Sequence, residues 1–173
     1  MKIKYDRLII GLDFGGNKSR HAIALSGIYN NNLYTLKTRC LEANGVTPLQ
    51  LYEWVQKFIN DSIEDYGKVN YLYADSAEQT LINGLRKNIV IPIYNSIKNP
   101  INERIRAKNI LLASERYKVV KEECQDIIDF YRDAVWDETK DDDVRLDNGS
   151  YNNDIGDAEE YSWEYELNRL IRR

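Results

Sequence analysis

The sequence is poor in the residues that build disulfide frameworks and histidine metal sites. Its 173 residues include 2 cysteines and 1 histidine, and Cys40 and Cys124 stand far apart without a CxxC pair. We therefore expect reduced thiols and no zinc site. No apolar run approaches the ~20 residues of a membrane span, and the polar N-terminus leaves no room for a secretory signal. These absences predict a cytoplasmic protein that is neither secreted nor inserted in a membrane.

Proline and glycine are also scarce, at 3 and 9 residues, and no low-complexity run or internal repeat is present. Hydrophobic residues make up 43% and charged residues 30% of the chain. This composition is typical of a globular protein and not of a disordered one. A chain of this length forms one domain of ordinary size. We therefore predict a single domain over 1–173.

Charge is divided unevenly along the chain, although the net charge is only -4. Residues 1–120 hold 17 Lys and Arg against 11 Asp and Glu, whereas residues 121–173 hold 7 against 17. A basic first part suits a polyanion and an acidic last part can supply metal ligands, but a solvated surface explains both equally well. Residues 137–154, with seven acidic residues and few apolar ones, predict a mobile acidic loop.

Apolar patterning predicts an α/β fold. Short apolar or alternating segments separated by turn residues indicate three antiparallel strands, and later strands alternate with segments of helical spacing, as in parallel βαβ units. The result is a mixed sheet of three antiparallel strands followed by parallel strands, flanked by helices. We predict strands at 7–13, 20–26, 32–39, 69–74, 88–94 and 116–119, and helices at 48–66, 78–87, 101–113, 121–131 and 155–171.

Four acidic residues stand at positions suited to a site. Asp13 and Asp75 each end a predicted buried strand, and Asp154 and Asp157 lie at the start of the last predicted helix. Carboxylates at neighbouring strand ends repel one another unless a cation such as Mg²⁺ or Mn²⁺ neutralises them. Two such ions can support phosphodiester hydrolysis. Spacing alone does not separate this site from ordinary turn and helix-capping residues.

The order of these acids resembles that of a known family. Gly11-Leu12-Asp13-Phe14-Gly15, Tyr73-Ala74-Asp75-Ser76-Ala77-Glu78, and the segment from Asn153 to Tyr161 follow one another as in the C-terminal nuclease domain of the large terminase subunit of tailed double-stranded DNA bacteriophages. The stretch 93–131 is similar to the middle region of the same family, so the resemblance covers nearly the whole chain.

The resemblance implies a ribonuclease H-like fold and a metal-dependent DNA endonuclease that cuts concatemeric viral DNA during genome packaging. It implies that Asp13, Asp75, Asp154 and Asp157 are the catalytic, metal-binding residues, with Mg²⁺ or Mn²⁺, two ions in all, as the cofactor. It further implies double-stranded DNA as substrate, an N-terminal packaging ATPase domain, the small terminase subunit and the portal as partners, and the host bacterial cytoplasm as location.

The chain departs from the family pattern in two ways. Asp154 stands where relatives often have His, and Gly156 with the acidic pair Glu159-Glu160 replaces residues that favour a helix, which predicts a helix start that frays without metal. The chain also has no G-x-x-x-x-G-K-[ST] motif for a packaging ATPase. We therefore expect the motor domain to be absent from this chain, which would be the C-terminal half of a large subunit.

Three alternatives remain open. A Holliday-junction-type resolvase uses a few acidic residues on the same fold. The segment from Gly11 to Ser19 also looks like the phosphate-binding hairpin of actin-like and sugar-kinase ATPases, which would make the chain an ATP-binding fragment. A non-enzymatic interaction domain would leave the acids dispersed and without an ion.

Basic residues near the acidic positions are candidates for contact with DNA. Such groups hold phosphates in a salt-dependent manner that is largely independent of sequence. The candidates are Lys18, Arg20, Lys98, Arg104, Arg106 and Lys108.

Overall fold

The computed structural model describes residues 3–16, 19–134, 138, 145 and 153–171. Its strands are β1 (Arg7–Asp13), β2 (Arg20–Tyr29), β3 (Asn32–Glu42), β4 (Tyr71–Ala74), β5 (Ile93–Asn95) and β6 (Tyr117–Val119). Its helices are α1 (Pro48–Tyr66), α2 (Gln79–Asn88), α3 (Ile101–Ala113), α4 (Gln125–Asp133), α5 (Asn153–Trp163) and α6 (Leu167–Ile171), with 3₁₀ turns η1 (Lys121–Glu123) and η2 (Glu164–Glu166).

The strands form one six-stranded sheet in the order β5-β4-β1-β2-β3-β6. The first three strands are antiparallel neighbours, whereas β4 runs parallel to β1, β5 parallel to β4, and β6 parallel to β3. Asn30 and Asn31 take positive φ angles of 49° and 59° in the turn between β2 and β3, a conformation that asparagine tolerates in tight hairpins. The predicted mixed sheet is confirmed.

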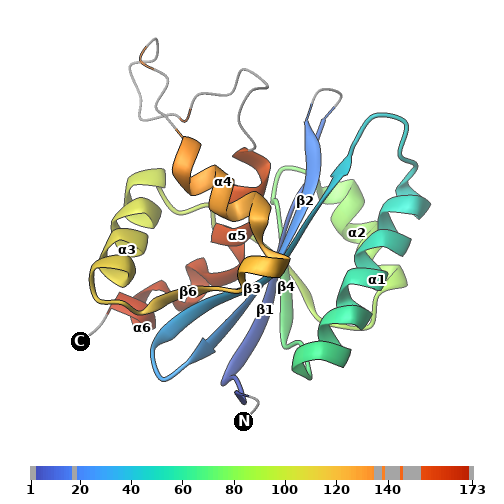
Figure 1. Ribbon diagram of the computed structural model, residues 1–173. Helices are drawn as coiled ribbons and strands as arrows, with labels where there is room; N and C mark the ends of the chain where they lie inside the picture. The colour runs from blue at the N-terminus through green and yellow to red at the C-terminus, as the bar shows by residue number, and fades with distance from the viewer. Residues whose placement is uncertain (1–2, 17–18, 135–137, 139–144, 146–152, 172–173) are drawn as a thin grey trace.

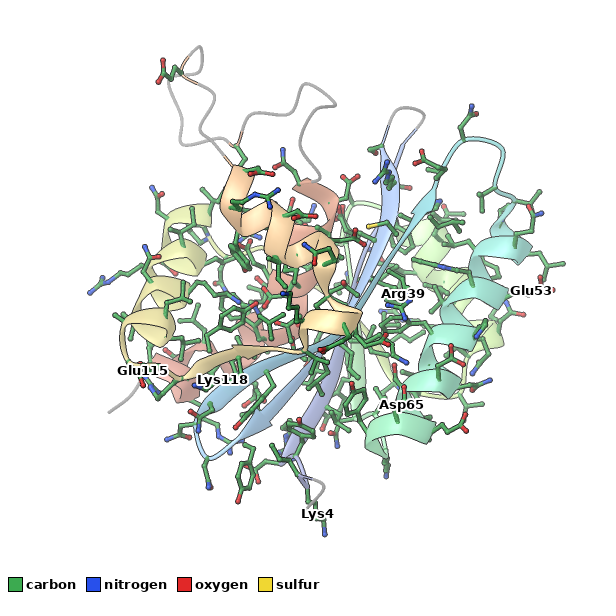
Figure 2. The ribbon with its side chains drawn as sticks, in the orientation of Figure 1. Lys4, Arg39, Glu53, Asp65, Glu115 and Lys118 are labelled. Atoms are coloured by element: carbon green, nitrogen blue, oxygen red, sulfur yellow. The ribbon has the colours of Figure 1, made fainter. Side chains whose placement is uncertain are left out.

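Helices cover both faces of the sheet (Figure 1), with α1 and α2 on one side and α3 to α6 on the other. The apolar side chains of β1 alternate between the two layers: Leu8, Ile10 and Leu12 pack toward α1 and α2, and Ile9 packs against Trp163 and Leu170 on the other face. Figure 2 shows charged side chains such as Glu53 on α1 and Glu115 after α3 pointing outward. No helix among the described residues is long and apolar enough to span a membrane.

The structure differs from the sequence prediction in three elements. The helix predicted at 121–131 is divided into the 3₁₀ turn η1 and helix α4, with Cys124 between them in a non-helical conformation. The strand predicted at 88–94 is confined to Ile93–Asn95, because α2 continues to Asn88 and Val90 lies 98% exposed in the loop that follows. The helix predicted at 155–171 is interrupted after Trp163 by the turn η2. Most of the predicted acidic loop at 137–154 lies outside the described residues. Both cysteines are described, and no disulfide joins them.

Candidate active site

Asp13 and Asp75 leave the sheet side by side. Their strands run parallel with Leu12 opposite Ala74, and the backbone N–H of Asp75 donates to the carbonyl of Leu12 at 2.9 Å. Alternation along a strand places Asp13 on the same face as Gly11, and the backbone of Gly11 lies directly against α5. The carboxyl ends of two neighbouring strands therefore deliver two carboxylates beneath α5.

Helix α5 crosses the sheet at close range because Gly11 has no side chain. A Cβ atom at Gly11 would lie 1.9 Å from the carbonyl oxygen of Ala158 and 2.6 Å from the nitrogen of Ser162. This approach brings Asp157, one residue before Ala158, over the end of β1. Asp154 lies one turn earlier, and its Oδ2 accepts a hydrogen bond of 2.8 Å from the backbone N–H of Arg20 at the start of β2.

Gly11 offers a test of this placement. We expect Gly11→Ala to lower the free energy of unfolding by about 1–3 kcal/mol, since an added methyl group in a filled space forces the backbone of α5 to shift. Urea denaturation followed by circular dichroism measures the change. Gly16→Ala is the matched control, because a Cβ there meets nothing within 4 Å. Equal stability of the two variants would contradict the close packing of α5 on β1.

The other three predicted acids lie close enough to Asp13 to affect its pKa. Asp13 is 7% exposed, and burial raises its pKa well above the ordinary value, with further contributions from the negative charges of Asp157, Asp75 and Asp154. Lys98 acts in the opposite direction on the pKa of Asp13 but does not cancel these effects. Burial and the neighbouring carboxylates together therefore disfavour the ionised form of Asp13.

Cationic side chains already contact two of the acids. Nζ of Lys98, in the loop between β5 and α3, lies 2.5 Å from Oδ1 of Asp75. Nη1 of Arg104 on α3 lies 3.0 Å from Oδ1 of Asp157, and Nη1 of Arg145 lies 3.3 Å from the same oxygen. Lys98 and the two arginines approach the acids from elements outside β1, β4 and α5.

The carboxylates fit a divalent cation by chemistry, although they are not arranged around one. Within the described part of the chain, no three acidic, histidine or cysteine side chains form a ready metal-binding group, and Asp75 and Asp157 point to cationic side chains instead. The donors are all carboxylate oxygens, which Mg²⁺ and Mn²⁺ prefer. A bound cation would favour the ionised form of Asp13, which burial and three acidic neighbours disfavour.

The predicted DNA-contact residues fall into two groups. Arg20, Lys98 and Arg106 are exposed, and Arg20 pairs with Glu42 at 2.7 Å. Lys18 lies outside the described residues. Arg104 and Lys108 are 8% and 3% exposed, so neither presents its charge at the surface. The Nζ of Lys108 lies 2.5 Å from Oε1 of Glu159 inside the protein, a position that does not favour the predicted contact with DNA.

Sequence reasoning missed the acidic pair that anchors α5. Glu160 is buried and binds both Arg104 and Arg145. Glu159 accepts hydrogen bonds from Lys108, Thr35, Tyr117, Tyr131 and Trp163. Burial acts to raise the pKa of Glu159, but Lys108 and the surrounding donors outweigh burial and lower it. The available signal was the position of the pair between Ala158 and Tyr161 on an apolar stripe.

Comparison with solved structures identifies phage nuclease domains with a similar fold. The large terminase (g2p) nuclease domain of bacteriophage SPP1, with bound Mn, is 19% identical with a TM-score of 0.68 and covers 94% of this chain and 88% of its own. The large terminase nuclease of thermophilic phage G20c, with bound magnesium, is 19% identical with a TM-score of 0.60, covering 91% of this chain and 80% of that one.

The large terminase of thermophilic bacteriophage D6E is 21% identical with a TM-score of 0.75; the match covers 100% of this chain but 42% of the D6E chain. The present chain thus spans less than half of that protein. Neither the protein-family models nor the curated proteins give a match. At these identities the likeness shows the fold, which is the ribonuclease H-like fold that the motifs implied.

Proposed function

We propose that this chain is a metal-dependent DNA endonuclease that cuts concatemeric viral DNA during genome packaging. The observation that carries the proposal is the convergence of Asp75, Asp154 and Asp157 on the buried carboxyl of Asp13, at the end of two parallel strands. The fold supports it, since the similar SPP1 and G20c domains are nucleases that hold Mn and magnesium respectively.

The four carboxylates would hold the metal, with Asp13 and Asp75 contributed by the sheet and Asp154 and Asp157 by α5. We propose two ions, Mg²⁺ or Mn²⁺. Such ions polarise a phosphodiester and lower the pKa of water, so hydrolysis requires no covalent enzyme intermediate. Arg104 and Arg145 fix the carboxylate of Asp157 from the side of α3, and Lys98 neutralises Asp75.

Exposed cations around the acids would bind the DNA backbone. The backbone N–H of Arg20 donates to Asp154, the ammonium group of Lys98 lies beside Asp75, and Arg106 is exposed on α3. We include Lys18 on its sequence position. Arg104 would act through Asp157 and not as a phosphate ligand, because its guanidinium lies between two carboxylates. Phosphate contacts of this kind give binding that weakens with salt.

We further propose that the chain works beside a packaging ATPase domain, the small terminase subunit and the portal in the host bacterial cytoplasm. The support for the ATPase is the longer D6E large terminase, one structure of which is a complex with ATP-gamma-S. The nuclease would then act as one part of a DNA-packaging machine.

Plasmid cleavage tests the activity directly. We expect the purified chain to nick and linearise supercoiled DNA with Mn²⁺ or Mg²⁺ and to leave it intact with EDTA. Asp75→Asn, prepared in the same way, should show no cleavage, which excludes a contaminating nuclease. Cleavage confined to synthetic four-way junctions would identify a resolvase of the same fold, and no cleavage with any divalent ion would overturn the proposal.

A further inference from the structure

Lys98 is held in an unusual backbone conformation. Its φ angle is 55°, in the left-handed region that L residues with a side chain seldom occupy. Strained residues of this kind persist only where the surroundings enforce them, and they gather at functional sites. In this conformation, Nζ of Lys98 lies 2.5 Å from Oδ1 of Asp75.

The carboxylate of Glu164 holds the backbone of Lys98 in this conformation. Oε1 of Glu164 accepts the backbone N–H of Ile97 at 2.7 Å and that of Lys98 at 3.1 Å, and Oε2 accepts the N–H of Asn99 at 3.0 Å. Glu164 itself is 2% exposed. Three consecutive amides thus converge on one buried carboxylate, an arrangement that fixes a loop tightly because hydrogen bonds to a charged acceptor are strong.

The same contact coincides with the break in the C-terminal helix. Helix α5 ends at Trp163, and Glu164 opens the turn η2 from which its side chain reaches the loop between β5 and α3. The segment formed by α5 and η2 therefore carries both Asp157 and Glu164, the residue that fixes Lys98. Helix α5 carries the candidate metal ligand Asp157, and the residue that follows the helix fixes the cation beside Asp75.

We propose that Glu164 is a positioning residue for DNA cleavage, which acts by holding Lys98 where its ammonium group meets the phosphate of the strand to be cut. The inference rests on the proposed nuclease function. Lys98 is a compact charge on a flexible stem, so its usefulness beside Asp75 depends on where the backbone places it. Arg104 and Arg145 are bound to Asp157 and Glu160 on the side of α5, whereas Lys98 contacts Asp75 at the end of β4.

A double-mutant cycle tests the proposal. Glu164→Gln keeps the shape of the side chain, but its amide nitrogen cannot accept a backbone N–H. The loop therefore loses one of the two oxygens that accept its amides. We expect kcat for plasmid cleavage to fall by on the order of 10- to 100-fold, the size of effect that small misplacement produces, with a much smaller change in the KM for DNA. The kcat of Lys98→Ala should be lower by a similar factor. The double variant should be no slower than Lys98→Ala alone.

Glu166→Gln is the matched control. Glu166 lies in the same turn, but its carboxylate faces Arg169 at 3.8 Å, so we expect kcat to remain unchanged. Hydrogen exchange gives a readout independent of cleavage: the amides of Lys98 and Asn99 should exchange faster in Glu164→Gln. If this variant does not fold, Glu164→Asp, which keeps the charge but shortens the reach, takes its place in the cycle.

The outcomes separate the inference from the proposed function. If Glu164→Gln slows cleavage by the same factor with and without Lys98, Glu164 does not act through Lys98 and the positioning role is overturned while the nuclease stands. If the amides of Lys98 and Asn99 exchange at unchanged rates in Glu164→Gln, the carboxylate of Glu164 does not fix this loop and the proposal is overturned. If the unsubstituted chain shows no metal-dependent cleavage, both the function and the inference fail.

Discussion

Replacing Asp13 by asparagine should abolish metal-dependent cleavage and, at neutral pH, make the protein more stable. Asp13 is buried, and burial together with Asp157, Asp75 and Asp154 raises its pKa well above the ordinary value. The folded state therefore pays a free-energy penalty to keep this carboxylate ionised. Asparagine has nearly the same shape and no charge. We expect a gain of about 1–3 kcal/mol, the range for relieving an uncompensated buried group.

The gain should depend on pH with a definite sign. In the unfolded chain Asp13 ionises near its reference pKa of about 3.9, whereas the folded protein retains the proton to higher pH. Stability therefore falls as the pH rises from the unfolded pKa to the folded one, and the penalty is constant above that. Asp13→Asn removes the penalty, so its advantage is greatest at neutral pH and disappears below the unfolded pKa.

Thermal melts of both proteins across this pH range, with and without Mg²⁺, measure the effect. Mg²⁺ should raise the melting temperature of the unsubstituted chain more than that of Asp13→Asn. Asp61→Asn is the control, because the hydrogen bond from Lys57 lowers the pKa of Asp61 on the surface, so its loss should bring no stabilisation and leave cleavage intact. A less stable Asp13→Asn at neutral pH would contradict the account.

Glu159→Ala should have the opposite effect and destabilise the whole domain. Glu159 is fully buried and is the counterion of Lys108, which is equally enclosed. Its removal leaves a buried ammonium without a partner, and also deprives Tyr131 and Trp163 of their acceptor. Breaking a buried pair from one side costs about 3–5 kcal/mol, a large part of the roughly 5–15 kcal/mol that stabilises a typical domain.

Urea denaturation of Glu159→Ala and of the double variant Glu159→Leu with Lys108→Met measures this effect. The double variant should recover much of the lost stability, because apolar side chains can replace a buried ion pair at little cost. Asp61→Ala, which breaks the exposed pair with Lys57, should change stability little. If the double variant is as unstable as Glu159→Ala, the orphaned charge of Lys108 is not the cause.

The sequence predicted those parts of the fold that depend on local patterning. Continuous apolar runs place β1 and β4 in the buried sheet, and Asp13 and Asp75 follow from the ends of those runs. The helical spacing after Thr47 predicted α1, and the structure shows the cap there, with the Thr47 hydroxyl accepting the N–H of Gln50. These features need only neighbours in the chain, which is why a single sequence indicates them.

Contacts between distant segments explain what the sequence did not indicate. Lys108 and Glu159 are ordinary surface residues by composition, and they become a buried pair only when α3 and α5 pack on the same face of the sheet. Helix α5 likewise ends at Trp163, just before Glu164, whose carboxylate accepts amides about 65 residues earlier in the chain. Each partner is polar, and nothing nearby in the sequence marks it as buried.

The candidate site joins the beginning of the chain to its end, since Asp13 lies on the first strand and Asp157 on a helix near the last residue. Ribosomes synthesise the first strand long before the helix that covers it. A nascent chain can therefore display Asp13 and Asp75 but cannot complete the acidic cluster until α5 has emerged and docked on β1. Contacts so distant in sequence form slowly, so the acidic cluster is assembled only after nearly all of the residues up to α5 have been synthesised.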